Sequence, residues 1–342
     1  MLRITVGYDA RMTIIPPKLA RGSGIRIIAP SCTLPSMPWV DDAHLERCKK
    51  FFTDLGMTVT EGKYLRKMAE LQTTSIQHRV EDIHDAFRDP SVHALIAIRG
   101  GWNSNQLLRH LDYDLIRANP KIFCGFSDIT APANAIYAKT GLVTYSGPNF
   151  SQFGTGEQVH YTYDSFLACL TRDAPYVIEA SARWSDDFFS PEHTELSFED
   201  NDGPWIFAAG EAEGTIAGGN LCTFNLLQGT EYLPPIKDTI LFLEDDHESL
   251  PRAFDRDLQS ILHLPHIDTI RGLVIGRFQK VSGMTRELLE HIVRTKAELP
   301  KDIPIIANVD TGHTKPMATF PIGGTARISI TSNKSTIEIL CH

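Results

Sequence analysis

Apolar residues in the first 150 positions gather in short runs, and segments with helical spacing separate one run from the next. The run 94–98 is apolar throughout, which is typical of a central strand buried on both faces. Ser75 is a typical helix N-cap, and Ile76, Val80, Ile83 and Phe87 after it form one apolar helix face. The predicted strands are 25–30, 57–60, 94–98, 121–126 and 143–146; the predicted helices are 41–55, 75–87, 107–111 and 115–118.

Strands that alternate with helices indicate βαβ units, so we predict an α/β fold with a parallel sheet. The second half continues with strands at 238–243, 272–276, 303–307, 326–330 and 336–340, and with helices at 221–227, 250–262 and 286–299. The stretch 180–205 between the halves is acidic, aromatic and weakly periodic, which favours a long loop between two domains. Residues 1–23 are expected to form an extension to which we assign no function.

Composition narrows the class of protein. A formal net charge of -9 over 342 residues argues against a large surface for nucleic acid or anionic membrane. The six cysteines form no Cys-x-x-Cys pair, so reduced thiols are expected rather than a zinc site or a disulfide scaffold. The first residues lack the apolar core of a signal peptide, and no apolar run reaches the roughly 20 residues of a membrane helix. We expect a cytoplasmic protein.

Two loops follow predicted strands at the edge where parallel sheets place their sites. Ser127 stands at a corner between strand and helix, where its hydroxyl would face the positive end of the helix. The alternative interpretation is an ordinary helix N-cap. Gly100 and Gly101 follow the neighbouring strand and could leave backbone amides free for a ligand, or could simply form a tight turn.

Two further strand ends carry residues that a serine nucleophile requires. Glu244 directly follows the predicted strand 238–243, and His313 lies in a tight loop after the predicted strand 303–307. A serine needs a neutral imidazole to accept its proton, and a carboxylate holds that imidazole in the correct tautomer. Thirteen histidines make a chance match easy, so the residue types alone leave this triad as one interpretation.

Other kinds of site are disfavoured. The chain has no phosphate loop of the Gly-x-x-x-x-Gly-Lys type, no Gly-x-Gly-x-x-Gly turn after a strand, and no His-Glu-x-x-His helix. An acidic loop with Asp245, Asp246, His247 and Glu248 could bind a divalent ion, but solvated surface is the simpler interpretation.

Five motifs in this order resemble the LD-carboxypeptidase family of serine peptidases, over roughly residue 24 to the end. They are Arg99-Gly-Gly-Trp-Asn-Ser-Asn, Gly125-Phe-Ser-Asp-Ile-Thr, Gly218-Gly-Asn-Leu, Leu241-Phe-Leu-Glu-Asp-Asp and Gly312-His-Thr-Lys-Pro-Met. The resemblance implies a Ser127–Glu244–His313 triad, with the backbone amides of Asp128 and Gly101 as oxyanion hole. It also implies no metal, no cofactor and a homodimer.

The resemblance further implies an N-terminal nucleophile domain with a parallel, Rossmann-like sheet and a C-terminal β-rich α/β domain. The predicted boundaries are 1–23 for the extension, 24–175 for the nucleophile domain, 176–205 for the aromatic loop, and 206–342 for the domain that carries Glu244 and His313.

The sequence after the glycine pair separates two branches of the family. Murein tetrapeptide carboxypeptidases usually continue with Tyr-Gly, whereas Trp102-Asn-Ser-Asn resembles the microcin C immunity branch. That branch cleaves the amide between an acidic residue and a modified adenylate, and an aromatic loop stacks on the nucleobase. The expected substrate-binding residues are Trp102, Asn103, Ser104, Trp184, Asn220 and Lys315, with Phe188 and Phe189 as weaker candidates for stacking.

Lys315 departs from the pattern, because a second histidine is expected there in the immunity branch. We therefore expect a serine peptidase for a small aminoacyl-nucleotide substrate. A murein LD-carboxypeptidase is the alternative within the family, and a non-catalytic adenylate-binding module is the alternative of another class.

Overall fold

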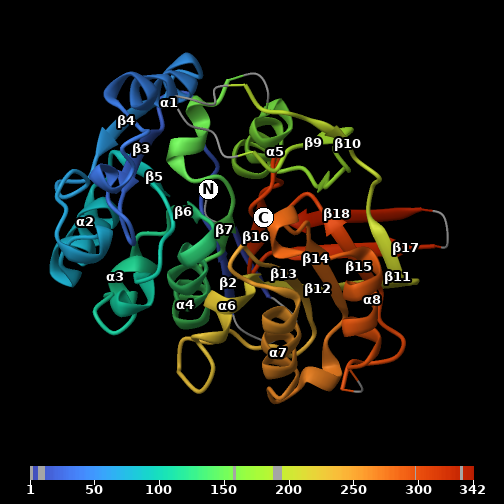
Figure 1. Cartoon of the computed structure of the whole chain (residues 1–342). Helices are drawn as coiled ribbons and strands as arrows, with labels where there is room; N and C mark the ends of the chain where they lie inside the picture. The colour runs from blue at the N-terminus through green and yellow to red at the C-terminus, as the bar shows by residue number, and fades with distance from the viewer. Residues whose placement is uncertain (1–2, 7–11, 157–158, 188–194, 297, 332–333) are drawn as a thin grey trace.

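The structure is a computed structural model that describes residues 3–6, 12–156, 159–187, 195–296, 298–331 and 334–342. It contains two large sheets, which Figure 1 shows side by side, with helices packed around them. The first sheet has six strands, in the spatial order β16 (Phe320–Ile322), β7 (Thr144–Ser146), β6 (Ile122–Gly125), β5 (Val92–Ala97), β3 (Gly24–Ile28) and β4 (Thr58–Glu61).

Strands β7, β6, β5, β3 and β4 are parallel, as the alternation of strands and helices predicted. Every residue of β6 is buried. Helix α2 packs its apolar face against the core. At its N-terminus, Ser75 Oγ accepts a hydrogen bond from His78 N, as expected for an N-cap. The helices of this half are α1 (Asp42–Asp54), α2 (Ile76–Arg88), α3 (Tyr113–Ala118), α4 (Thr130–Thr140) and α5 (His160–Thr171).

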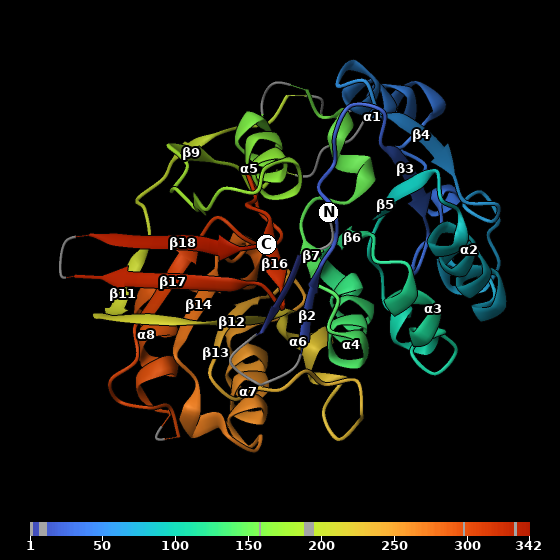
Figure 2. The ribbon, with the colours of Figure 1, turned by 180° about the vertical axis from the view of Figure 1, so that it is seen from behind.

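The second sheet has eight strands with a parallel centre, β12 to β15, and antiparallel strands on both sides (Figure 2). Its spatial order is β11 (Trp205–Ala208), β15 (Ile305–Val309), β14 (Gly272–Gly276), β13 (Thr239–Glu244), β12 (Gly210–Asn220), β17 (Thr325–Ile330), β18 (Ser335–Cys341) and β8 (Tyr176–Val177). Helices α6 (Leu221–Asn225), α7 (Pro251–Leu262) and α8 (Arg286–Arg294) belong to this half.

Helix α4 joins the two halves. Its first turns are made of small residues that are all buried, which lets the helix approach strand β12 closely. Asn134 Nδ2 donates to the carbonyl of Gly218 at 2.7 Å. A Cβ on Gly219 would lie 2.6 Å from Thr130 Oγ1, so only glycine permits this approach. Because α4 begins just after Ser127, this packing brings the second sheet to the edge of the first.

The predicted α/β class is confirmed, and several local predictions are wrong. A short 3-10 helix at Ser104–Leu107 replaces the predicted helix at 107–111, and α8 ends at Arg294 rather than near 299. The segment 176–205 contains the two-residue strands β8, β9 (Arg183–Trp184) and β10 (Glu199–Asp200), which are too short to produce a periodic pattern. Strand β16 comes from the C-terminal part of the chain yet completes the first sheet.

The described part of the N-terminal extension is also structured. Strands β1 (Arg3–Val6) and β2 (Met12–Ile15) form an antiparallel hairpin. Backbone hydrogen bonds join Ile14 to Gly141 and Val143, so the hairpin lies against the start of β7. Ile15 and Leu19 belong to the buried core of the first half.

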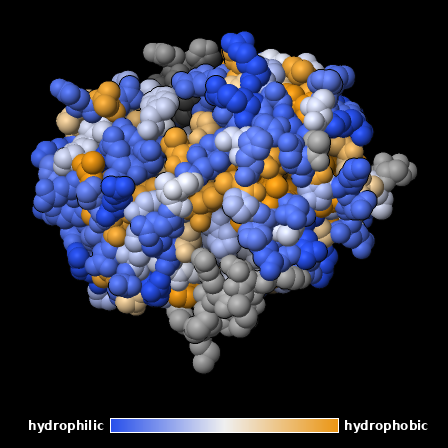
Figure 3. Space-filling model, turned by 90° about the horizontal axis from the view of Figure 1, so that it is seen from below, coloured by the Kyte–Doolittle hydropathy of each residue, from blue (hydrophilic) through white to orange (hydrophobic). Residues whose placement is uncertain are grey.

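One face of the molecule is mainly hydrophilic (Figure 3). On this face, hydrophobic residues gather in a band across the middle, with hydrophilic residues around it. Among the described residues, no helix combines the length and the apolar composition that crossing a membrane requires.

Candidate active site

Ser127 stands at a sharp turn between β6 and α4. Its φ of 64° lies in the left-handed region, which a non-glycine residue rarely occupies and which costs about 1–3 kcal/mol. A 3-10 turn, Ser127–Ile129, leads from there into α4. A Cβ on Gly100 would lie 2.8 Å from Ser127 Cβ, so the glycine pair after β5 makes room for this serine. Such a turn projects the hydroxyl from the sheet edge.

The Asp128 carboxylate holds the loop beside Ser127 in place. Its Oδ2 accepts hydrogen bonds from Ser31 Oγ at 2.5 Å, Asn103 N at 2.9 Å and Ser104 N at 2.8 Å. Ser104 Oγ donates in turn to the Asp128 carbonyl at 2.6 Å. Across the described residues, the amides of Gly101 and Asp128 donate to no backbone or side-chain acceptor. These two amides are therefore available to a ligand.

Glu244 is the last residue of β13, and His313 lies in the loop after β15; their side chains contact each other. His313 Nδ1 and Glu244 Oε2 are 2.7 Å apart, and the carboxylate is buried. A Cβ on Gly312 would lie 2.5 Å from Glu244 Oε2, and one on Gly276 would lie 2.7 Å from Glu244 Cβ. Both glycines are thus required for the carboxylate to reach the imidazole. The His313 ring lies 5.0 Å from that of Phe126, the residue before Ser127.

The environment of His313 favours its protonated form. Burial acts to lower the pKa of His313, but the charge of Glu244 and the hydrogen bond to it outweigh burial, and Asp246 and Asp245 act in the same direction. The net result is a pKa above the usual 6.5. An imidazole with a raised pKa is a stronger base toward a nearby hydroxyl.

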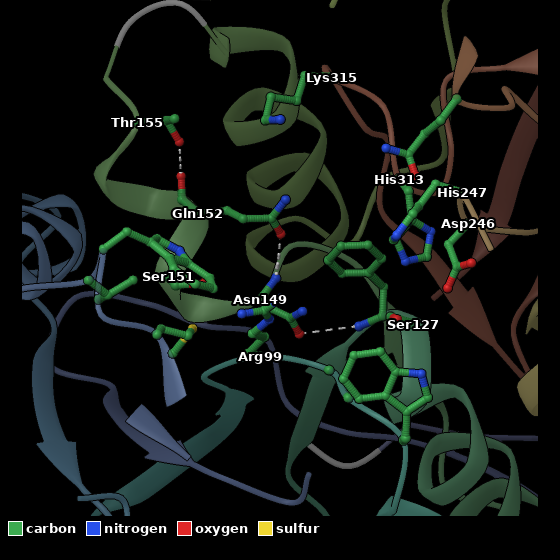
Figure 4. A pocket seen from close by; sticks show the side chains of 18 of the residues that line it. Arg99, Ser127, Asn149, Ser151, Gln152, Thr155, Asp246, His247, His313 and Lys315 are labelled. Carbon is green, nitrogen blue, oxygen red and sulfur yellow. Dashed lines mark hydrogen bonds between the residues drawn. The ribbon is translucent and has the colours of Figure 1, made fainter. Parts of the chain in front are cut away.

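Ser127 and His313 line one cavity of about 240 Å³, which Figure 4 shows from close by. Six other residues singled out from the sequence also line it, namely Gly100, Gly101, Trp102, Asp246, His247 and Lys315. The sequence prediction missed most of the opposite wall, which includes Met37, Trp39, His44, Asn149, Ser151, Gln152 and Thr155. Asn149 follows β7, so a search of every strand end would have found it.

Three predicted substrate-binding residues lie behind the cavity wall rather than on it. Asn103 and Ser104 are buried and bonded to Asp128, and the Asn103 side chain also accepts a hydrogen bond from Arg79. Asn220 caps α6 by accepting from Thr223 N at 3.1 Å. The structure brings these residues close to the site as support, and direct substrate binding by them stays a prediction.

Trp184 is the predicted stacking residue, and it does not line this cavity. Its ring lies between two cations, with the Arg277 guanidinium at 5.1 Å and Lys280 Nζ at 5.2 Å from its centroid. Backbone hydrogen bonds between Ser185 and Lys315 join the same segment to the loop of His313. A stacking role for Trp184 stays a prediction, and Phe188 and Phe189 lie outside the described residues.

Within the described ranges, no three His, Cys, Asp or Glu side chains are grouped so that they could hold a metal ion. This statement covers the acidic loop of Asp245, Asp246, His247 and Glu248. All six cysteines are free thiols.

The comparison with known families matches both halves of the chain. The profile of the LD-carboxypeptidase N-terminal domain matches residues 25–147, and that of the LD-carboxypeptidase C-terminal domain matches residues 213–328. The protein named Putative carboxypeptidase YocD of Bacillus subtilis is 48% identical over 95% of this chain and 99% of its own. The microcin C7 self-immunity protein MccF of Escherichia coli is 32% identical over 85% of this chain and 86% of its own.

A murein tetrapeptide carboxypeptidase of Pseudomonas aeruginosa is 25% identical over 78% of this chain and 81% of its own. Among solved structures, an MccF-like protein from Bacillus anthracis superposes with a TM-score of 0.92 at 47% identity, over 96% of this chain and 99% of its own. The structure of MccF in complex with glutamyl sulfamoyl guanosine superposes with a TM-score of 0.82 at 30% identity, over 96% and 98%.

The His313–Glu244 pair predicts a measurable shift in titration. The ring of His313 should titrate above pH 6.5 in wild type, and Glu244→Gln should lower its pKa because burial then acts without the opposing charge. Since folding raises this pKa, the stabilisation by the pair is fully present below pH 6.5 and is lost as the pH rises through the raised value. Histidine NMR titration, assigned with His313→Asn, measures both values. Equal pKa values in wild type and Glu244→Gln would contradict the assignment.

Proposed function

The chain belongs to the LD-carboxypeptidase family, and from that premise we propose that it is a serine peptidase with Ser127 as nucleophile, His313 as general base and Glu244 as the residue that orients His313. The observation that carries the proposal is the 2.7 Å bond between His313 and a buried carboxylate, beside a serine with left-handed backbone. A serine and an imidazole held by a carboxylate are the groups that an activated nucleophile requires, which supports the proposal.

The proposed reaction starts with proton transfer. The bond between Nδ1 and Glu244 leaves Nε2 of His313 as the nitrogen that accepts the proton of Ser127 Oγ. The serine oxygen attacks the carbonyl carbon, and His313 then gives the proton to the departing nitrogen, so that the amine leaves and an acyl-enzyme remains. Water attacks the ester by the same route and releases the acid.

The negative charge on the substrate oxygen needs donors that are already in place. The amides of Gly101 and Asp128 are the proposed oxyanion hole, because both are free of other acceptors within the described chain. Asp128 directly follows Ser127 in the chain, and Gly101 lines the same cavity as Ser127. Loss of one such donor typically costs about 10²–10³ in kcat. The hydrogen bonds to Asp128 would keep both amides fixed throughout the reaction.

We assign the substrate to the aminoacyl-nucleotide class, cleaved at the amide next to an acidic residue. The support is the sequence Trp102-Asn-Ser-Asn and the 32% identity with MccF, solved structures of which contain glutamyl sulfamoyl guanosine and aspartyl sulfamoyl adenosine. Murein tetrapeptide is the alternative substrate, supported by the 25% identical relative. A cytoplasmic location and a homodimer stay predictions.

The substrate class can be tested by offering both substrates to the wild-type protein. We expect turnover of aspartyl sulfamoyl adenosine to exceed turnover of a murein tetrapeptide. The first reaction is measured by chromatography of the released aspartate, and the second by the D-alanine released. Turnover of the tetrapeptide alone would reject the nucleotide assignment. Tight binding of the nucleotide with no product from either substrate would instead indicate a non-catalytic binding module.

The role of Ser127 predicts a large loss of rate on removal of one oxygen atom. Ser127→Ala should bind substrate and unfold at the temperature of wild type or above, since alanine removes no packing atom, while kcat falls by roughly 10⁴ or more. Ser151→Ala is the matched control, because Ser151 is the other serine on the cavity wall and should retain turnover. Retained turnover in Ser127→Ala with loss in Ser151→Ala would reverse the assignment.

A further inference from the structure

Arg99 is a cation inside the cavity that no described acidic side chain neutralises. It follows β5, is partly buried and lines the same cavity as Ser127. Burial lowers the pKa of its guanidinium, and Cys32 is the ionisable group that acts in the opposite direction. Burial also raises the pKa of the Cys32 thiol, so this thiol is neutral at neutral pH and does not pair with Arg99. A desolvated guanidinium stays charged at neutral pH and needs hydrogen-bond acceptors. The N–H donors of Arg99, which have no acceptor among the described residues, therefore point to an anion that arrives with the substrate.

Arg99 lies over an aromatic ring. Its guanidinium carbon is 4.7 Å from the centroid of the Trp39 ring, a cation–π contact that uses none of the N–H donors of the guanidinium. An open guanidinium edge presents paired N–H donors that match the two oxygens of a carboxylate.

Two neutral amides on the cavity wall complete the donor set (Figure 4). Asn149 Oδ1 accepts from Phe126 N at 3.4 Å, and Gln152 Oε1 accepts from Asn149 N at 2.8 Å. Both oxygens are thus occupied by backbone donors, while the amide NH₂ groups donate to none of the described residues. The wall around Arg99 is therefore rich in donors, which suits a ligand that only accepts.

Lys315 is the other cation of the cavity, and its position differs from that of Arg99. Its Nζ donates to the backbone carbonyl of Asp187, and the charges of Asp186 and Asp187 act on it. Lys315 is therefore already engaged with the segment between the two halves, whereas Arg99 has no comparable acceptor among the described residues.

We propose that Arg99 binds a free carboxylate of the substrate and makes the enzyme selective for substrates that carry one. This inference rests on the proposed function, because it concerns the same reaction at Ser127. Arg99 and Ser127 follow the neighbouring parallel strands β5 and β6, which lie about 4.8 Å apart. The carboxylate is thus only a few bonds from the carbonyl that is attacked. It is either the side chain of an acidic acyl residue or the C-terminal carboxylate of a peptide.

The test compares each acid with the carboxamide of the same shape. One pair is aspartyl and asparaginyl sulfamoyl adenosine; the other is a murein tetrapeptide that ends in D-alanine or in D-alaninamide. In wild type, kcat/KM should favour the acid of the substrate that is turned over. In Arg99→Gln this ratio of kcat/KM values should fall roughly 10- to 100-fold, because kcat/KM falls for the acid and stays unchanged for the carboxamide. The pair that shows the effect identifies which carboxylate Arg99 binds.

Two variants keep the test decisive. Arg99→Lys retains the charge and should keep part of the preference, and it replaces Arg99→Gln if the latter fails to fold, as judged by thermal unfolding. Lys315→Gln removes the second cation and should leave the ratio of acid to carboxamide unchanged. A ratio near one in wild type, an unchanged ratio in Arg99→Gln, or a ratio that falls only in Lys315→Gln would overturn the inference. Absence of turnover for all four compounds would instead reject the proposed function.

Discussion

The carboxylate of Asp128 is the interaction on which the arrangement at the sheet edge depends. It accepts hydrogen bonds from Ser31 after β3 and from the backbone of Asn103 and Ser104 after β5, while its own backbone follows the serine after β6. One buried charge thus joins the loops of three adjacent parallel strands. Arg79 binds the same loops from the other side through the carbonyls of Pro30 and Asn103. Loss of one of these donors would leave the buried carboxylate partly unsatisfied, at a cost of about 1–3 kcal/mol or more, which favours the observed arrangement of the three loops.

The second half of the chain approaches the edge of the first sheet that carries Ser127 because helix α4 has small buried side chains. Small residues on the helix and glycines on β12 let the two sheets approach, and the strand next to β12 is β13, which ends at Glu244. Gly276 and Gly312 then leave the space in which the carboxylate meets His313. Ser127 and His313 lie more than 180 positions apart in the sequence, with Glu244 between them, yet the relative placement of the three residues follows from close backbone packing.

The sequence predicted the strand ends well and their side-chain directions poorly. Buried strands and strand-to-helix turns have local signals, so Ser127, Glu244 and His313 could be located from pattern and residue type. Asn103 and Ser104 face inward because Asp128 is buried beneath them, which is a tertiary effect with no local signal. Trp39 lies in a loop and Gln152 in the short 3-10 helix Phe150–Gly154. Both were missed because their part in the cavity depends on chain segments far away in sequence. The strands around Trp184 were too short for periodicity to reveal.

The central claim is that His313 activates Ser127 as a nucleophile, and covalent labelling tests it most directly. The wild-type protein is treated with a fluorophosphonate, and intact-mass and peptide mass spectrometry then locate the adduct. The account predicts a single adduct on Ser127 in wild type, and labelling slowed by orders of magnitude in His313→Ala of unchanged thermal stability. An adduct on any other serine, or equal labelling rates in wild type and His313→Ala, would contradict it.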